Sequence, residues 1–427
     1  MLDFLKKNPV TYALGHFVMS QRTAVLAACH LHRERKRPRP EGPIRVGFLC
    51  QYLPAWSKVS SVYEIMRKDP RFSPCLICIP SEQVMDKKTF AACPENDTYD
   101  YFVAQGYDAI NALTGPEQWL DLEGLGLSYI FYPRPYQHHL PAPYHTWNVS
   151  RYCRICILMY GIVFAKEDVR AALNQNFMSH VYFYFAENPF AQRTNRRVNP
   201  LGHLLGLQKS VCFGLPVLEN LQKQKDLPSP AWDFSPNTFR VMWTPRWTTD
   251  KKLGGTNFFT YYTSLLDFAE AHPDMAFLHR PHPLALSHFQ KTGEMSAREV
   301  LAYLDRCEQL PNVAQDKQPA YETTFWGASV LVSDISGMMP EYFSTGKPLI
   351  FCATNMELAL TPDTKRMLEG CYTVNNKAEL FDTLLKLQAG EDPLAEKRQQ
   401  IALELFGDLS RSPSRDIAEA IYADFGR

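Results

Sequence analysis

The sequence contains no uninterrupted apolar run of about 18 residues, the length that a membrane-spanning helix requires, so no transmembrane helix is predicted. Net charge is also absent, because 45 basic residues balance 45 acidic ones and the isoelectric point is near 7.2. A chain without an overall positive field is not expected to bind an extended nucleic acid. The sequence shows no internal repeat or low-complexity tract, which argues against a repeat architecture. Near the N-terminus, His16, Gln21 and Arg22 interrupt the apolar stretch, so a signal peptide is not predicted either.

The 11 cysteines lack the spacing of a zinc site. Two CxxC pairs occur, Cys75 with Cys78 and Cys153 with Cys156, and both lie in apolar segments with the pattern of a buried strand. Alternation within buried strands explains these pairs better than a metal does. Such cysteine usage is typical of the reducing cytoplasm, so we expect a cytoplasmic protein.

At 427 residues, of which 45% are apolar, the chain is long enough for two domains with sizeable cores. Apolar runs alternate with helical patterns in both halves, which predicts an α/β fold with two doubly wound parallel sheets and a cleft between them. We expect a helical, basic N-terminal extension at 1–43, a Rossmann-like domain at 44–220, and a second Rossmann-like domain with C-terminal helices at 237–427. Strands are expected at 44–49, 75–79, 128–132, 155–159, 181–185, 239–243, 276–278, 330–332 and 349–351, and helices at 56–67, 99–111, 261–271, 297–306 and within 392–422.

The N-terminal extension has an amphipathic helical pattern at 11–31, and a basic run from His32 to Arg39 follows it. A basic amphipathic segment of this kind could rest on an anionic membrane surface. The alternative is a solvated helix end followed by a linker. The sequence therefore leaves two options open, a free helix or a peripheral contact with the inner face of the plasma membrane.

The stretch from Val330 to Cys352 has the pattern of a buried strand, a turn, a short helix, a second turn and a second buried strand. Its first turn contains Ser333, Asp334, Ser336 and Gly337. Free backbone N–H groups collect where a strand ends and a helix begins, and the helix dipole there favours an anion. With Ser336 as an N-cap, this turn is predicted to bind a phosphate.

Two further polar turns follow strands of the second half, one with Thr244 and Arg246 and one with Arg280 and His282. In a parallel sheet, turns of this kind lie at the same edge. The two arginines would supply charge-assisted phosphate contacts. His282 lies between two prolines that stiffen its backbone, so it could donate to a phosphate or act as an acid. Each motif taken by itself has a purely structural alternative. The turn that contains His282 could be a rigid turn without a ligand, and Asp334 could merely cap a helix.

The order of these motifs resembles the CDP-glycerol glycerophosphotransferase family of teichoic-acid and capsule polymerases, which have a two-domain glycosyltransferase-B fold. The resemblance covers about 239–421, and before 220 it is only architectural. The matching segments are Thr244-Pro245-Arg246, Arg280-Pro281-His282-Pro283, Ser333-Asp334-Ile335-Ser336-Gly337, Gly346-Lys347-Pro348-Leu349-Ile350-Phe351, and elements near Phe406–Asp408 and Ser414–Asp416. The resemblance implies a nucleotide-diphosphate pocket, with His282 stabilising the leaving phosphate. By the resemblance its residues would be Arg280, His282, Asp334, Ser336 and Gly337. The residues Thr244, Arg246, Ser333 and Glu341 complete the set that we predict to bind the nucleotide or its phosphates.

Two residues depart from the family pattern. The family carries a Trp-His-Gly motif whose histidine is the proposed base, and Tyr160 stands at the matching place. A tyrosine with an ordinary pKa of about 10 is a poor base at neutral pH. Gly337 replaces a serine, which removes a hydroxyl but keeps the backbone open to a phosphate. After the strand at 128–132, His138 or His139 could replace the missing base or belong to a surface loop, and Glu187 is a further candidate.

The resemblance implies a transferase that uses a nucleotide-activated donor, such as CDP-glycerol, a related CDP-polyol or a nucleotide sugar. The acceptor would be a cell-surface polysaccharide or a lipid-linked sugar held by the N-terminal half. No metal or other cofactor is required, because basic side chains and backbone dipoles would stabilise the developing charge. Two alternatives stay open. One is an enzyme like the nucleotide-sugar 2-epimerases, and the other is a non-catalytic nucleotide- or glycan-binding partner of a polymerase.

Overall fold

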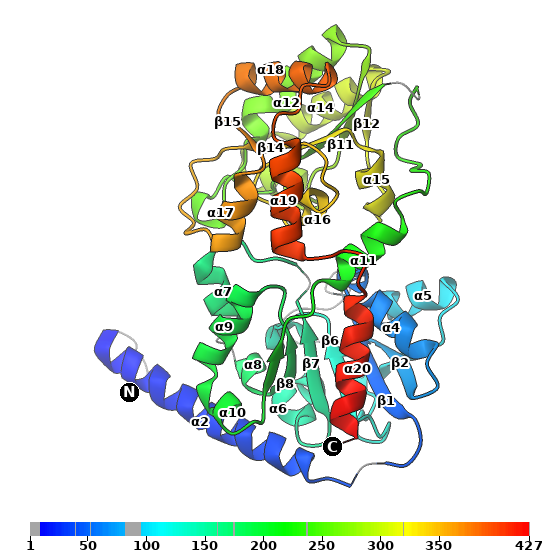
Figure 1. The fold of residues 1–427 in the computed structure, drawn as a ribbon, viewed down its shortest axis with the longest axis vertical. Coiled ribbons are helices and arrows are strands. Elements are labelled where there is room, and N and C mark those ends of the chain that lie inside the picture. The colour runs from blue at the N-terminus through cyan, green and yellow to red at the C-terminus, as the bar shows by residue number, and fades with distance from the viewer. Residues whose placement is uncertain are drawn as a thin grey trace. The chain divides into compact units, whose positions relative to one another are not determined.

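The computed structural model describes residues 9–38, 40–51, 53–81, 95–159, 161–173, 176–235, 238–318 and 320–426. The chain forms two compact units (Figure 1). The first unit comprises Met1–Gly161, Asp168–Pro216 and Ser412–Arg427, and the second comprises Ile162–Glu167 and Val217–Arg411. The end of the chain therefore belongs to the first unit, whereas the sequence pattern placed all of 237–427 in the second.

The described part of the first unit contains a parallel sheet of seven strands. Its central strands are continuous apolar runs, because strands that are buried on both faces need apolar side chains at every position. The five strands predicted for this half are confirmed, and the short edge strands β3 and β9 are additional. In spatial order the strands are β3 (Ala109–Asn111), β2 (Phe72–Cys78), β1 (Ile44–Cys50), β6 (Tyr129–Tyr132), β7 (Arg154–Leu158), β8 (Val181–Phe185) and β9 (Lys209–Val211). A small antiparallel pair, β4 (Leu113–Gly115) and β5 (Gln118–Trp119), precedes β6.

Helices surround this sheet, beginning with α2 (Pro9–Arg35), which confirms the predicted N-terminal helix. The helix predicted at 56–67 is divided into α3 (Leu53–Trp56) and α4 (Ser60–Arg67). The helix predicted at 99–111 ends early, because α5 (Asp97–Ala104) is followed by the edge strand β3. The remaining helices of this part are η1 (Gln137–His139), η2 (Ala142–Tyr144), α6 (Thr146–Val149), α7 (Lys166–Leu173), α8 (Asn176–Ser179), α9 (Pro189–Val198) and α10 (Pro200–Leu204). Helix α11 (Pro216–Lys223) belongs to the second unit from its second residue onward.

The C-terminal helix α20 (Pro413–Phe425) packs against α4 and completes the core of the first unit (Figure 1). Its side chains Ile417 and Ile421 are fully buried among those of the sheet. At its start, Ser414 donates a hydrogen bond to Ser61 of α4, with 2.7 Å between the hydroxyl oxygens. Burying an Ile side chain contributes roughly 1.5–3 kcal/mol, so α20 is an integral part of this core.

The described part of the second unit contains a parallel sheet of six strands. The four predicted strands form its centre, and the three-residue strands β12 and β15 are additional. The spatial order is β12 (Val313–Gln315), β11 (Met275–His279), β10 (Phe239–Thr244), β13 (Val330–Ser333), β14 (Leu349–Cys352) and β15 (Tyr372–Val374). The chain order reverses between β10 and β13, which is where doubly wound folds bind ligands.

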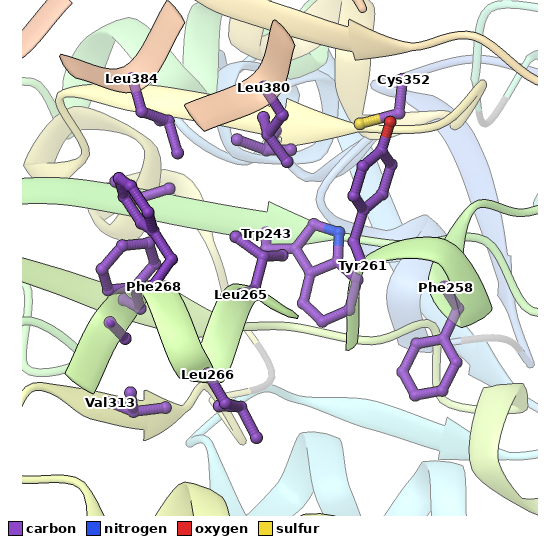
Figure 2. Packing of buried hydrophobic residues seen from close by; sticks show 14 of the residues in the cluster. Trp243, Phe258, Tyr261, Leu265, Leu266, Phe268, Val313, Cys352, Leu380 and Leu384 are labelled. Atoms are coloured by element: carbon purple, nitrogen blue, oxygen red, sulfur yellow. The ribbon is translucent and has the colours of Figure 1, made fainter. Parts of the chain in front are cut away.

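The core of the second unit is built around Trp243 of β10, which stacks on Phe258 of α12 (Phe258–Ala271). Figure 2 shows side chains of α12 packed against the sheet, with the hydroxyl of Tyr261 beside the sulfur of Cys352. The predicted helices at 261–271 and 297–306 are confirmed. Beside α12, this unit contains η3 (Lys251–Leu253), α13 (Ala285–Thr292), α14 (Ala297–Gln309), α15 (Glu322–Gly327), α16 (Met338–Phe343), α17 (Pro362–Leu368), α18 (Lys377–Gln388) and α19 (Ala395–Phe406).

Both CxxC pairs belong to strand segments. Cys75 and Cys78 lie in β2, while Cys156 lies in β7 and Cys153 directly precedes it. All four are free thiols. Among the helices that the structure describes, none combines the length and the apolar character needed to cross a membrane.

Candidate functional site

The turn after β13 is fixed by two buried hydroxyls at the ends of neighbouring strands. Thr244 ends β10, Ser333 ends β13, and the two residues pair in the parallel register. The hydroxyl of Thr244 donates to that of Ser333 at 2.8 Å, and the Ser333 hydroxyl lies 3.0 Å from the Thr244 carbonyl oxygen. Both side chains are buried, so they fix the start of the turn from inside the protein and do not contact solvent.

Asp334 holds two loops together from inside the protein. Its Oδ2 accepts hydrogen bonds from the Thr256 hydroxyl at 2.7 Å and from the backbone N–H groups of Arg246 and Asn257, each at 3.1 Å. Only 2% of the residue is exposed. Burial raises the pKa of this carboxyl to about 6, and the three hydrogen bonds and the Arg246 charge oppose the rise. Asp334 is therefore a positioning residue, not the ligand contact that the sequence suggested.

A glycine is required where the second loop approaches the turn. Gly254 has a φ of +103°, which side chains rarely tolerate, and an added Cβ would lie 2.6 Å from Cγ2 of Ile335. The Arg246 guanidinium would be the next contact, at 3.2 Å. Gly254 thus leaves the space that this guanidinium occupies.

The predicted N-cap at Ser336 is wrong, because Gly337 is the residue that caps α16 and no side-chain hydrogen bond caps this helix. The Ser336 hydroxyl lies 3.1 Å from that of Ser333 instead, and its carbonyl accepts from the Met339 N–H. Gly337 is exposed with an ordinary helical conformation, and a Cβ there would meet no atom within 4 Å. The backbone at Gly337 is therefore open to solvent.

Two arginines supply positive charge beside this turn. Nη1 of Arg246 donates to the Ile335 carbonyl oxygen at 2.7 Å. Arg280 forms an ion pair with the fully buried carboxylate of Asp316, and its guanidinium carbon lies 5.4 Å from the centroid of the Tyr321 ring. Both arginines are partly buried, so their positions are held before any ligand arrives.

Glu341 connects α16 to the Arg280 turn. It is 5% exposed and accepts a hydrogen bond from the Tyr321 hydroxyl at 2.6 Å, while the Tyr321 ring faces Arg280. Sequence reasoning missed Tyr321, Asp316 and Thr256. Asp316 directly follows β12, so recognising that short strand would have placed it at the same sheet edge.

His282 presents its imidazole at the exposed side of the site. Its Nδ1 accepts the Leu284 N–H at 3.2 Å, so the neutral ring carries its proton on Nε2. The ring centroid lies 6.2 Å from that of Trp247. Partial removal of the ring from water, and then the charge of Arg246, lower the pKa of His282 below its usual value. At neutral pH this residue is therefore a hydrogen-bond donor through Nε2–H.

The second sheet thus brings together nine predicted residues at one edge. The exposed residues there are His282 and Gly337, and the partly buried ones are Arg246, Arg280 and Ser336. The buried ones, which position the others, are Thr244, Ser333, Asp334 and Glu341.

His138 and His139 belong to the first unit, in η1 after the end of β6. Their ring centroids are 3.9 Å apart, His138 is exposed and His139 is partly buried. The carbonyl of His139 accepts from Nε2 of Gln51 at 2.6 Å, and Nη2 of Arg134 lies 3.3 Å from Oε1 of Gln51. Gln51 follows β1, so these residues mark the switch point between β1 and β6, and sequence reasoning missed Gln51 and Arg134.

The other candidates of the first unit are not placed together with these histidines. Glu187 is 5% exposed and accepts a hydrogen bond from the Tyr184 hydroxyl at 2.5 Å, so it faces the interior. Tyr160 lies outside the described residues. Among the residues that the structure describes, no group of three or more His, Cys, Asp or Glu side chains could hold a metal ion.

Comparison with solved structures identifies the fold. No protein-family model and no curated protein matches the sequence. The UDP-GlcNAc 2-epimerase from Neisseria meningitidis, solved with bound UDP-GlcNAc, is 14% identical with a TM-score of 0.57, covering 89% of this chain and 100% of that chain. The UDP-GlcNAc 2-epimerase from Methanocaldococcus jannaschii is 12% identical with a TM-score of 0.56, covering 89% and 100%.

A structure of the wall teichoic acid polymerase TagF is also similar, with 13% identity, a TM-score of 0.53, and coverage of 97% of this chain and 96% of that chain. Identities this low establish the fold alone. The predicted fold class is confirmed: the chain has two doubly wound parallel sheets of the glycosyltransferase-B type.

Proposed function

We propose that this protein is a transferase that takes a polyol phosphate or glycosyl group from a nucleotide-diphosphate donor. CDP-glycerol, a related CDP-polyol or a nucleotide sugar would be the donor, and a cell-surface polysaccharide or a lipid-linked sugar the acceptor. The observation that carries the proposal is the placement of Arg246, Arg280 and His282 beside the switch point of the second sheet. Guanidinium groups match the geometry of phosphate oxygens, and Nε2–H of His282 adds a further donor.

With a CDP-polyol donor, an acceptor hydroxyl attacks the phosphorus atom that carries the polyol. The P–O bond to CMP breaks, and CMP leaves with the electron pair. Arg246, Arg280 and His282 would stabilise the negative charge on the leaving phosphate. The proton of the attacking hydroxyl passes to a base, for which His138 and His139 of the first unit are the candidates. A bound diphosphate also raises the pKa of His282, because a nearby negative charge favours the imidazolium form.

A thermal-shift screen against CDP-glycerol, CDP-ribitol and UDP-sugars tests the donor site. A ligand at about 100 times its Kd stabilises the native state by about 2.7 kcal/mol, so one of these donors should raise the melting temperature. We expect Gly337→Glu to abolish the shift through repulsion of the phosphates, and His282→Ala to reduce it. The matched control is Gly337→Ala, whose Cβ meets nothing and which should keep the shift. An equal shift in all three variants would remove the assignment of the donor to this edge.

The similarity to UDP-GlcNAc 2-epimerases supports one alternative, an epimerase acting on a free nucleotide sugar. An epimerase needs no acceptor. Incubation with a labelled donor, with and without acceptor, followed by product analysis separates the two activities. Release of nucleotide that depends on the acceptor supports transfer, and a changed sugar configuration without acceptor supports epimerisation. Binding without either product would indicate a non-catalytic partner of a polymerase.

We also propose that the first unit contacts an anionic membrane through α2 and α10. These helices pack together, and Nη1 of Arg35 lies 3.4 Å from the Gly206 carbonyl oxygen. Four large apolar side chains protrude from the pair: Val25 (53% exposed), Leu26 (47%), Leu204 (84%) and Leu205 (52%). Within 22–37 five residues are basic, and the single acidic one is buried. Protruding leucines beside basic residues are typical of peripheral membrane contacts.

Co-sedimentation with vesicles tests this surface. The protein is expected to bind vesicles that contain anionic phosphatidylglycerol, to bind neutral phosphatidylcholine vesicles more weakly, and to be released by salt. The double variant Leu204→Asp/Leu205→Asp should lose most of the binding. Leu301→Asp/Leu403→Asp, at exposed leucines of the second unit, is the matched control. Retained binding in the first variant would contradict the proposal.

A further inference from the structure

A cavity of about 360 Å³ lies within the first unit, and none of its lining residues is among those assigned above. Its walls come from residues 119–123, which lead from β5 towards β6, and from five residues in and around α6: Pro143, Tyr144, Asn148, Arg151 and Tyr152. Ligand pockets in proteins usually measure 300–1,000 Å³, so this cavity is suited to one small ring-sized group.

One wall of the cavity is aromatic and rigid. Trp119 and Tyr144 meet edge to face, with 5.8 Å between their ring centroids and a 69° angle between the planes. Tyr144 is buried, and its hydroxyl donates to the Leu120 carbonyl oxygen at 2.9 Å, which fixes the ring. Tyr152 adds a third, half-buried ring. Tyr144 thus supports Trp119 from inside the protein, and the partly exposed rings of Trp119 and Tyr152 are the ones that can contact the apolar face of another ring.

The remaining lining is polar and mostly offers acceptors. One carboxylate oxygen of Asp121 accepts the Glu123 N–H at 3.0 Å, and the side chain is exposed. Asn148 donates through Nδ2 to the Ala142 carbonyl oxygen at 2.8 Å, which aligns its amide and leaves Oδ1 as an acceptor. The exposed Arg151 side chain supplies donors, and within the described residues it forms no ion pair.

We infer that this cavity binds a neutral saccharide unit. A pyranose ring has an apolar C–H face that fits Trp119 and a rim of hydroxyl donors that fits Asp121 and Asn148. The charges of the lining balance, because Arg151 accompanies Asp121 and Glu123 is paired with Arg37 at 3.0 Å, so the cavity does not select an anionic ligand. A wholly apolar ligand would remove the Asp121 carboxylate and the Arg151 guanidinium from water without offering them a hydrogen bond in return, which costs free energy. A hydroxylated ring can pack its C–H face on the aromatic wall and donate hydrogen bonds to the polar wall.

This site concerns binding alone and does not depend on the transfer reaction. It would hold a sugar unit of a glycan independently of any nucleotide, because none of its lining residues belongs to the donor edge of the second sheet. Weak, independent binding of this kind raises the local concentration of a linked glycan without new contacts at the reacting end.

Saturation-transfer NMR and titration calorimetry with the full chain test the site. The probes are N-acetylglucosamine, chitotriose, maltotriose and cellotriose, with glycerol 1-phosphate as the anionic comparison. We expect at least one neutral saccharide to bind, and Trp119→Ala and Asp121→Asn each to weaken it about tenfold. Trp147→Ala and Asp108→Asn, at exposed residues outside the cavity, should bind like the wild type.

Three results would overturn the inference: no binding of any neutral probe, tighter binding of glycerol 1-phosphate, or equal binding in Asp121→Asn and the wild type. The nucleotide-induced thermal shift, measured on the same variants, separates this site from the proposed donor site. Saccharide binding without any nucleotide shift would support the cavity and count against the donor assignment. A nucleotide-induced thermal shift without saccharide binding would support the donor assignment and count against the cavity as a saccharide site.

Discussion

Replacing Asp334 with alanine is expected to destabilise the second unit by about 2–4 kcal/mol, because three hydrogen-bond donors would lose their acceptor in a buried place. Replacement with asparagine should cost less than about 1 kcal/mol, since an amide oxygen can stand where Oδ2 accepts these bonds. Urea unfolding of the two variants and the wild type measures the difference. Equal stability of the alanine and asparagine variants would show that the carboxylate does not hold the two loops.

Comparison of the wild type with Asp334→Asn also tests the raised pKa of the Asp334 carboxyl. Folded Asp334 has a pKa of about 6, against 3.8 when exposed, so between these values the folded state binds a proton that the unfolded state does not. The wild type should therefore gain stability relative to Asp334→Asn as the pH falls from 7 to 4, by up to about 3 kcal/mol for a shift of two units. A loss of stability relative to Asp334→Asn over this interval would contradict the burial of an ionised carboxylate.

The central strands of both sheets could be predicted because burial on two faces leaves a clear mark in the sequence. Four of the five residues at 239–243 and all three at 330–332 are apolar, and a polar residue, Thr244 or Ser333, follows each run where the sheet edge begins. Parallel strands bring their carboxyl ends to the same edge, so the proximity of Thr244 and Ser333 follows from the strand assignments alone. The position of the candidate site was predictable for the same reason.

The edge strands and the direction of the polar side chains could not be predicted. Strands β12 and β15 have three residues each, too few to show a period, and with β12 the partner of Arg280, Asp316, was missed. The pattern of residues also does not say whether Asp334 points at a ligand or into the protein. Only the positions of Thr256 and Asn257, about 80 residues earlier in the chain, decide this.

The placement of α20 was a further miss, and its reason is tertiary. The apolar stripe of Ile417 and Ile421 would suit either core, so amphipathicity alone does not select one. In the structure, Asp424 of this helix accepts hydrogen bonds from Tyr129, Arg154 and Tyr182 of the first sheet. These polar contacts join segments that are far apart in the chain. No local sequence pattern encodes them, so the sequence could not show that this helix packs in the first unit.

Replacing Arg154 with methionine is accordingly expected to destabilise the first unit by about 3–5 kcal/mol, as measured by urea unfolding. Arg154 is 1% exposed and forms ion pairs with Glu34 of α2 and Asp424 of α20. Its removal takes the guanidinium charge away from two buried carboxylates, Glu34 and Asp424, of which Asp424 also pairs with Lys209. A double variant, Arg154→Met/Glu34→Gln, should recover part of the loss, because the amide needs no counter-charge.

The matched control is Arg71→Met, which removes an ion pair with Glu419 on the outer face of the same helix. Its side chain is one-third exposed, so water replaces the lost partner and the expected cost is below about 1 kcal/mol. If burial of charge is what makes the Arg154 contacts important, the two arginine variants must differ by at least about 2 kcal/mol although both release α20 from one ion pair. A similar loss of unfolding free energy in the two variants would mean that apolar side chains alone stabilise the packing of α20. The buried charges would then determine only which core the helix packs against.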